Sequence, residues 1–132
     1  MRIEYRLNAA ATAKEVVDVF VRSGIHRPTD DLERIQQMLD RANLTITAWD
    51  GNKLIGIARS LTDFCYCCYL SDLAVDKEYQ RSGIGQELIE QTRTRLSEQV
   101  SLILLSAPTA MSYYPYVGFD KADNAWIIRR KR

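Results

Sequence analysis

Hydrophobic and polar residues alternate along residues 2–7, which is the pattern of a half-buried strand. The apolar residues then follow the longer helical period between residues 16 and 21 and again between residues 32 and 39, so two amphipathic helices are predicted. An Asp-Gly pair at residues 50–51 interrupts a β-rich stretch that extends from residue 44 to residue 61. Because Asp-Gly favours a tight turn, this stretch is predicted to form an antiparallel hairpin.

The second half of the chain begins with a long β-rich run at residues 66–75, and a glycine-containing loop follows it. An amphipathic helix is predicted for residues 84–96. Residues 101–105 are apolar on both faces, which is typical of a central strand. Residues 107–117 predict a short helix and residues 125–129 a last strand. Since a helix joins the 66–75 and 101–105 strands, we expect them to be parallel neighbours.

This order of elements, βααβββαβαβ, predicts an α/β fold of the α+β type. It consists of a mixed, mostly antiparallel sheet of about six strands, flanked by about four helices. A chain of 132 residues has room for one hydrophobic core, so residues 1–132 are predicted to form a single domain. The predicted sheet leaves an edge after its last strand, and a homodimer that covers this edge is one expected arrangement.

Composition and charge narrow the functional classes. Apolar residues make up 46% and charged residues 27% of the chain, as in ordinary soluble domains. Lys and Arg number 18 against 17 Asp and Glu, and a net charge of +1 gives no field that would attract nucleic acid or an anionic membrane. No apolar run has the length of a membrane span, and the first residues do not resemble a secretory signal. A cytoplasmic location is therefore predicted.

The three cysteines, Cys65, Cys67 and Cys68, form one short cluster. There is no second cluster with which they could form disulfides, so they are expected to be buried or half-buried strand thiols in a reducing compartment. The only histidine, His26, lies far away in the sequence, which leaves a tetrahedral metal site without a fourth ligand. No metal site is predicted.

The most informative segment is the loop Gln-Arg-Ser-Gly-Ile-Gly at residues 80–85, which lies between a predicted strand and a predicted helix. Gly83 and Gly85 free the backbone so that successive N–H groups can face one oxyanion at the start of the helix. The loop lacks the Gly-Lys-Ser/Thr of a P-loop and the third glycine of a dinucleotide-binding fingerprint. From these residues alone, a phosphate site and a simple turn both remain open.

Together with the preceding Leu-Ala-Val at residues 73–75, this loop closely resembles the pyrophosphate-binding segment of the GNAT superfamily of N-acetyltransferases. Residues 110–119, Ala-Met-Ser-Tyr-Tyr-Pro-Tyr-Val-Gly-Phe, resemble a second element of that family, Ala-x-x-Phe-Tyr-x-x-x-Gly-Phe. The order of elements agrees with the family over residues 1 to 130. The resemblance implies the GNAT fold and acetyl-CoA-dependent transfer of an acetyl group to a primary amine, on either a small molecule or a protein.

The resemblance also implies how acetyl-CoA is bound. Backbone amides of the loop and of the first helical turn would hold the pyrophosphate, and the preceding strand would pair with the pantetheine arm as an extra strand does. The implied pyrophosphate residues are Arg81, Ser82, Gly83, Ile84, Gly85 and Gln86, and the implied pantetheine residues are Leu73, Ala74 and Val75.

Tyr114 matches the family position whose phenol donates a proton to the leaving thiolate, so it is the first catalytic candidate. By the same analogy, the oxyanion would lie near the amide of Leu73. Asp72 is the only carboxylate within the 66–75 strand and is the candidate general base or amine anchor. Strict alternation directs Asp72 and Leu73 to opposite faces unless a β-bulge intervenes, and the family often has one there.

Three further residues are candidates for contact with the acceptor. Tyr69 and Ser71 share the nominal face of Leu73 and could hold the acceptor or a relaying water. His26 lies in the loop between the first two helices, where the family commonly builds its acceptor wall.

The sequence departs from the family pattern at two places. Ala107 and Pro108 stand where many relatives have an Asn that contacts CoA, and Pro115 follows the tyrosine directly. A loop that binds pyrophosphate does not require a competent base, so a non-catalytic acetyl-CoA-binding regulatory module is the alternative function. A toxin that acetylates aminoacyl-tRNA is disfavoured by the net charge of +1.

Overall fold

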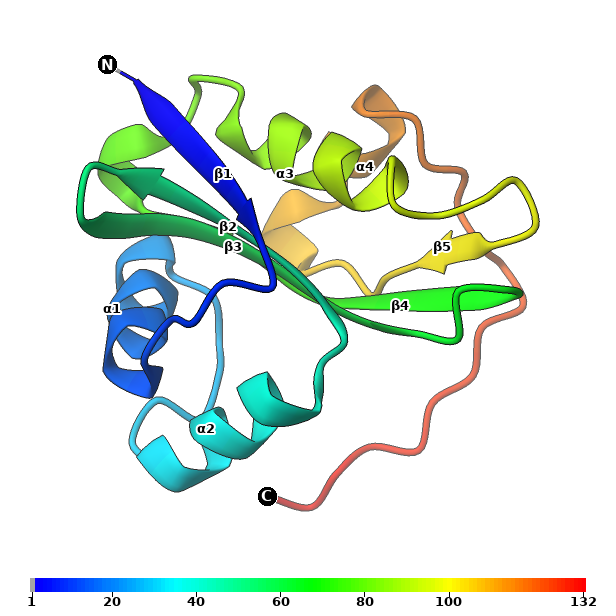
Figure 1. Ribbon diagram of the computed structural model, residues 1–132. Coiled ribbons are helices and arrows are strands. Elements are labelled where there is room, and N and C mark those ends of the chain that lie inside the picture. Colours follow the sequence, from blue (N-terminus) through cyan, green and yellow to red (C-terminus); the bar gives the residue numbers. More distant parts are fainter. Residues whose placement is uncertain (1) are drawn as a thin grey trace.

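The computed structural model describes residues 2–132 and shows a five-stranded sheet in the order β1-β2-β3-β4-β5, with helices on both faces (Figure 1). The helix α3 joins β4 to β5, as the sequence predicted. Two single 3-10 turns, Lys77–Tyr79 and Pro108–Ala110, lie in the connections. The elements are β1 Ile3–Leu7, α1 Ala13–Ser23, α2 Leu32–Arg41, β2 Leu44–Asp50, β3 Lys53–Thr62, β4 Cys67–Val75, α3 Ile84–Arg93, β5 Ser101–Ile103 and α4 Tyr113–Tyr116.

The pairing of the strands confirms a mixed, mostly antiparallel sheet. β1 to β4 pair antiparallel in sequence order, and β4 and β5 are parallel neighbours. β2 and β3 form the predicted hairpin around Asp50 and Gly51. The helices α1 and α2 lie on one face of the sheet, and α3 and α4 lie on the other (Figure 1). This arrangement agrees with the predicted fold class, apart from the number of strands.

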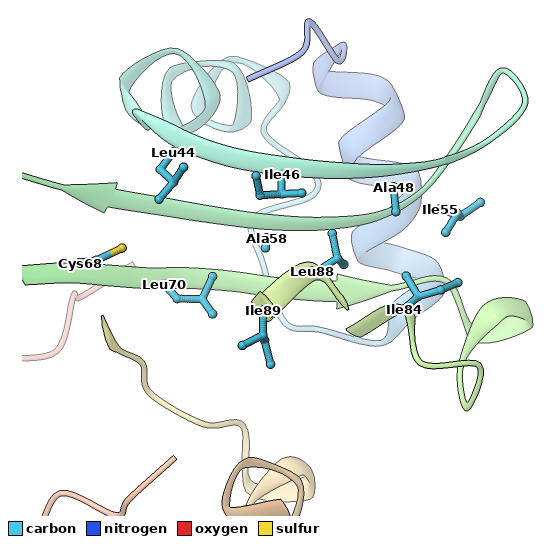
Figure 2. Close-up of a cluster of buried hydrophobic side chains, with 10 residues drawn as sticks. All are labelled: Leu44, Ile46, Ala48, Ile55, Ala58, Cys68, Leu70, Ile84, Leu88 and Ile89. Atoms are coloured by element: carbon cyan, nitrogen blue, oxygen red, sulfur yellow. The ribbon is translucent and has the colours of Figure 1, made fainter. Parts of the chain in front are cut away.

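Each face of the sheet has its own core. On the face of α3, Leu88 and Ile89 pack against apolar side chains from β2, β3 and β4 (Figure 2). On the other face, Phe20 of α1 and Ile35 of α2 pack against Ile57 of β3. Burial of such side chains contributes roughly 1.5–3 kcal/mol each relative to full exposure. Both faces of the sheet are thereby packed against helices, which holds β4 rigidly in place.

Local signals explain where α1 begins and ends. Thr12 accepts a hydrogen bond from the amide of Glu15, and the Glu15 side chain accepts one from the amide of Thr12, which is a complete capping box. Gly24 ends the helix with a φ of 84°, a left-handed conformation that favours glycine. The α1–α2 loop therefore begins at a fixed point.

The C-terminal part of the chain differs from the prediction. Residues 125–129 form no strand, and Trp126 and Ile128 are 96% and 101% exposed, so the sheet has five strands rather than six. β5 is consequently an edge strand, not a central one, and it comprises three residues. An apolar run becomes a strand only when a neighbour pairs with it, and here no such pairing forms. A homodimer that covers the β5 edge stays a prediction.

Two helical predictions are also corrected in their lengths. Residues 107–117 form a 3-10 turn and the one-turn helix α4 instead of one short helix, and Pro115 lies within α4. The helix α3 ends at Arg93 rather than at Leu96.

Among the thiols, Cys68 is buried, but Cys65 and Cys67 are exposed. In residues 2–132 no helix has both the length and the apolar character needed to cross a membrane.

Candidate active site

β4 and β5 are paired over only three positions, from Cys67 with Ser101 to Tyr69 with Ile103. Beyond Tyr69, β4 continues to Val75 and pairs with β3 alone. The two parallel strands therefore separate, and the backbone N–H and C=O groups on that side of β4 have no strand partner. Such an edge can form strand-like hydrogen bonds with an extended ligand.

A β-bulge lies in β4 at the point where the strands separate. Arg59 is paired with Asp72 and Ser60 with Leu70, so Ser71 is an extra residue without a register partner. The β-bulge on which the predicted directions of Asp72 and Leu73 depended is therefore present. It changes which side chains share a face, because Leu70 and Leu73 both belong to the α3-side core, although they are an odd number of positions apart.

The change of face corrects the expectation that Tyr69 and Ser71 share a face with Leu73. Tyr69 and Leu73 would share a face in a regular strand. Tyr69 lies next to Leu70 on the other side of the bulge, so it faces away from the core that Leu73 contacts. Ser71 is half-buried, and its Oγ accepts a hydrogen bond from Arg59 Nη2 at 3.0 Å. Neither the Tyr69 nor the Ser71 side chain lies on the same face of β4 as Leu73.

Asp72 lies on the opposite face from Leu73 and has an exposed fraction of 0%. Its Oδ1 pairs with Nε of Arg27, and its Oδ2 pairs with Nε of Arg59. A carboxylate that has no solvent-exposed surface, and whose two oxygens are both bound to guanidinium groups, cannot reach the amine of an acceptor. The geometry therefore does not suit the role of general base or amine anchor that the sequence predicted for Asp72.

The loop at residues 80–85 turns sharply before α3. Gly83 is the N-cap of α3 with a φ of 83°, and Arg81 also has a positive φ of 67°. Among residues 2–132 no side chain caps this helix, so its first amides have no side-chain partner there. A Cβ atom on Gly83 would meet nothing within 4 Å, which means that the space beside this residue is open. These first amides belong to Ile84, Gly85 and Gln86.

Tyr113 lies directly against this helical turn. A Cβ atom on Gly85 would lie 3.0 Å from the Tyr113 hydroxyl, so any larger residue there would crowd the phenol. Burial raises the pKa of Tyr113. The structure thus brings α4 to the N-terminus of α3.

Tyr114 follows in α4 and is half-buried. Its ring meets Tyr113 and Phe119 edge to face, with centroid distances of 5.3 and 5.5 Å. Burial raises the pKa of Tyr114, the neighbouring Tyr113 raises it further, and the charge of Arg27 lowers it. Because the balance lies above the ordinary value of 10.0, the phenol stays protonated at neutral pH and can act as a proton donor.

The remaining predicted contact, His26, is exposed in the α1–α2 loop. Its carbonyl oxygen accepts a hydrogen bond from Arg27 Nη1 at 2.6 Å, whereas its side chain has no partner in the described hydrogen bonds. Two cavities of about 360 and 540 Å³ lie along α1 and the β2–β3 turn, and neither contains a predicted site residue. The candidate site is therefore described by its backbone geometry.

Comparison with known proteins points to one family. A family model described as an acetyltransferase (GNAT) domain matches residues 8–127. GCN5-related N-acetyltransferase 2, chloroplastic, of Arabidopsis thaliana is 36% identical over 70 residues, which are 52% of this chain and 27% of that protein. The chain spans less than a third of the length of this curated relative.

Solved structures share the fold over almost the whole chain. A probable acetyltransferase from Staphylococcus aureus is 22% identical, with a TM-score of 0.82 and coverage of 98% of this chain and 100% of that one. The enzyme AAC(6')-Iy, in complex with a bisubstrate analog that contains CoA, is 12% identical, with a TM-score of 0.71 and full coverage of both chains. At these identities the similarity is one of fold.

Proposed function

Because the chain belongs to the GNAT acetyltransferase family, we propose that it transfers the acetyl group of acetyl-CoA to a primary amine. The observation that supports this most directly is the uncapped N-terminus of α3, which faces open space beside the free edge of β4. In the proposed reaction, the neutral amine attacks the thioester carbonyl and a carbon–nitrogen bond forms. The carbon–sulfur bond breaks, the nitrogen releases one proton to water, and the departing thiolate takes up one proton.

The loop and the first turn of α3 suit a pyrophosphate. The amides of Ile84, Gly85 and Gln86 have no side-chain cap, and the helix dipole adds roughly 0.3–1 kcal/mol for a negative charge at an exposed N-terminus. Arg81 and Ser82 precede them in the same turn and are exposed. We propose that these groups bind the phosphates and that side chains contribute little to the contact.

The edge of β4 from Leu73 to Val75 suits the pantetheine arm, because its backbone lacks a strand partner on the β5 side. The amide of Asp76 donates to Ile55 in β3, so by alternation the backbone groups of Ala74 also face β3, and those of Leu73 and Val75 face the free edge. The amide of Leu73 is our proposed donor to the oxyanion that develops on the carbonyl. Tyr114, protonated at neutral pH, is the proposed donor to the thiolate.

Deprotonation of the acceptor needs a separate account, since Asp72 is fully engaged by Arg27 and Arg59. We propose that the acceptor amine loses its proton to water before it attacks, without a dedicated carboxylate. The acceptor is a small molecule or a protein amine. His26 and the α1–α2 loop stay the proposed acceptor wall.

Calorimetric titration with acetyl-CoA and with CoA tests the cofactor site, followed by thiol release in the presence of a panel of primary amines. We expect saturable binding of both ligands with a Kd on the order of 1 μM to 1 mM, the range of ordinary enzyme substrates. We also expect acetyl-CoA turnover that depends on one class of amine. A native protein that binds neither ligand would contradict the proposed function altogether.

A further inference from the structure

The bulge in β4 creates a local problem for the backbone. Ser71 stands outside the register between Arg59–Asp72 and Ser60–Leu70, so its carbonyl has no defined partner in the ladder. An unpaired carbonyl that is partly buried costs free energy. Arg27 solves this problem, because its Nη2 donates a hydrogen bond of 2.7 Å to the Ser71 carbonyl oxygen.

Both arginines bind the bulge at two points. Arg27 contacts the Ser71 carbonyl and the Asp72 carboxylate, and Arg59 contacts the Ser71 hydroxyl and the same carboxylate. We call these four residues, Arg27, Arg59, Ser71 and Asp72, the arginine clamp. A planar guanidinium can span two acceptors at once, which an ammonium cannot.

The other ends of the clamp hold the surrounding elements. Arg27 Nη1 donates to the His26 carbonyl in the α1–α2 loop, and Arg59 Nη1 donates to the Met38 carbonyl in α2 at 3.1 Å. Thus the loop that borders the proposed acceptor site, the helix α2 and the bulge are joined through one buried carboxylate. Because a buried ion pair recovers little net stability after its desolvation, its value lies in fixing a geometry.

The clamp lies at the position where geometry matters for the proposed chemistry. β4 leaves β5 after Tyr69, the bulge follows at Ser71, and the proposed oxyanion donor Leu73 lies two residues farther on. Arg27 is also close enough to Tyr114 for its charge to act on the phenol. The clamp therefore adjoins the strand segment that carries the proposed oxyanion donor, and its Arg27 charge acts on the proposed acid.

We propose that Arg27 and Arg59 are positioning residues, which fix the bulge and thereby direct the Leu73 amide toward the reacting carbonyl. This inference rests on the proposed acetyl transfer. Loss of the guanidinium contacts of the arginine clamp should misalign the oxyanion donor. The pyrophosphate loop lies beyond the end of β4 and should stay intact. The signature is a fall in kcat with little change in the affinity for CoA.

The test compares Arg27→Met with Arg22→Met. Arg22 pairs with Asp76, which is buried just after β4, as Arg27 pairs with Asp72. Each carboxylate keeps a second cation after the substitution, Lys53 for Asp76 and Arg59 for Asp72. Both variants therefore lose an ion pair with a buried carboxylate, and only Arg27→Met also loses the hydrogen bond to the bulge.

We expect Arg27→Met to lower kcat about tenfold or more, with the acetyl-CoA KM and the CoA Kd within about twofold of the native values. Arg22→Met should keep kcat within about twofold. Arg27→Lys retains the charge but not the fork, so it should stay impaired. Native kcat in Arg27→Met, or an equal loss in Arg22→Met, would overturn the positioning role.

Amide hydrogen exchange of the unliganded proteins gives a readout that does not depend on turnover. Arg27→Met should speed exchange selectively at residues 70–73, whereas Arg22→Met should not. Faster exchange at residues 70–73 in Arg27→Met would support the clamp. If the native protein at the same time shows no acetyl transfer, the proposed function is contradicted. Unchanged exchange at the bulge would overturn the clamp even if the enzyme is active.

Discussion

Replacement of Tyr114 by Phe is expected to lower kcat for acetyl transfer by about 10²-fold or more, which is the usual contribution of a positioned proton donor. The substitution removes only the hydroxyl, so the edge-to-face contacts of the ring with Tyr113 and Phe119 are retained. The affinity for acetyl-CoA and for CoA should therefore stay within about twofold of the native value. Thiol release at saturating acceptor measures kcat, and calorimetry measures the two affinities.

Tyr116→Phe is the matched control for this experiment. Tyr116 lies in the same short helix but is 83% exposed, so loss of its hydroxyl should change neither kcat nor affinity. Native turnover in Tyr114→Phe would exclude Tyr114 as the acid. If the native protein binds acetyl-CoA but turns over with no amine, the regulatory module becomes the better account, because binding alone needs no acid.

The parts of the fold that the sequence predicted correctly are those set by local rules. The helix α1 has a capping box and a C-terminal glycine, and the β2–β3 hairpin has its Asp-Gly turn. The parallel pairing of β4 with β5 follows from the helix between them. These features depend on a few neighbouring residues, so a single sequence suffices to predict them.

The prediction of a last strand was wrong because strand formation there depends on distant parts of the chain. Residues 125–129 have the apolar composition of a strand, but a strand exists only through pairing with a neighbour, and Trp126 remains exposed. Which segment lies beside the β5 edge is decided by the tertiary arrangement of the chain. Periodicity contains no information about that choice.

Asp72 shows how a correct observation led to a role that the geometry does not suit. A lone carboxylate in an apolar strand is either functional or paired, and the sequence offered a signal for the second case. Arg59 is the only charged residue in the interior of the neighbouring apolar strand β3, and the hairpin register places it opposite Asp72. Arg27 could not have been found in this way, because it comes from a loop and reaches Asp72 through tertiary structure alone.

The proposed pyrophosphate site leads to the second large prediction, which uses two substitutions at one position. Gly83 has a φ of 83°, and among residues with side chains Asn and Asp tolerate this left-handed conformation best. A Cβ atom there meets nothing within 4 Å, so both side chains fit. Gly83→Asn and Gly83→Asp are nearly equal in shape and in backbone strain. They differ in one negative charge at the entrance to α3.

If the amides of Ile84, Gly85 and Gln86 bind the pyrophosphate, Gly83→Asp should weaken acetyl-CoA binding roughly 10- to 100-fold relative to Gly83→Asn. The reason is that like charges about 5 Å apart repel by a few kcal/mol at a protein surface. The difference should shrink as salt is added, since exposed charges are screened. Matching unfolding temperatures would show that the fold is unaffected. Equal affinity of the two variants would mean that the phosphates bind elsewhere, because no charge-dependent contact at the start of α3 could then exist.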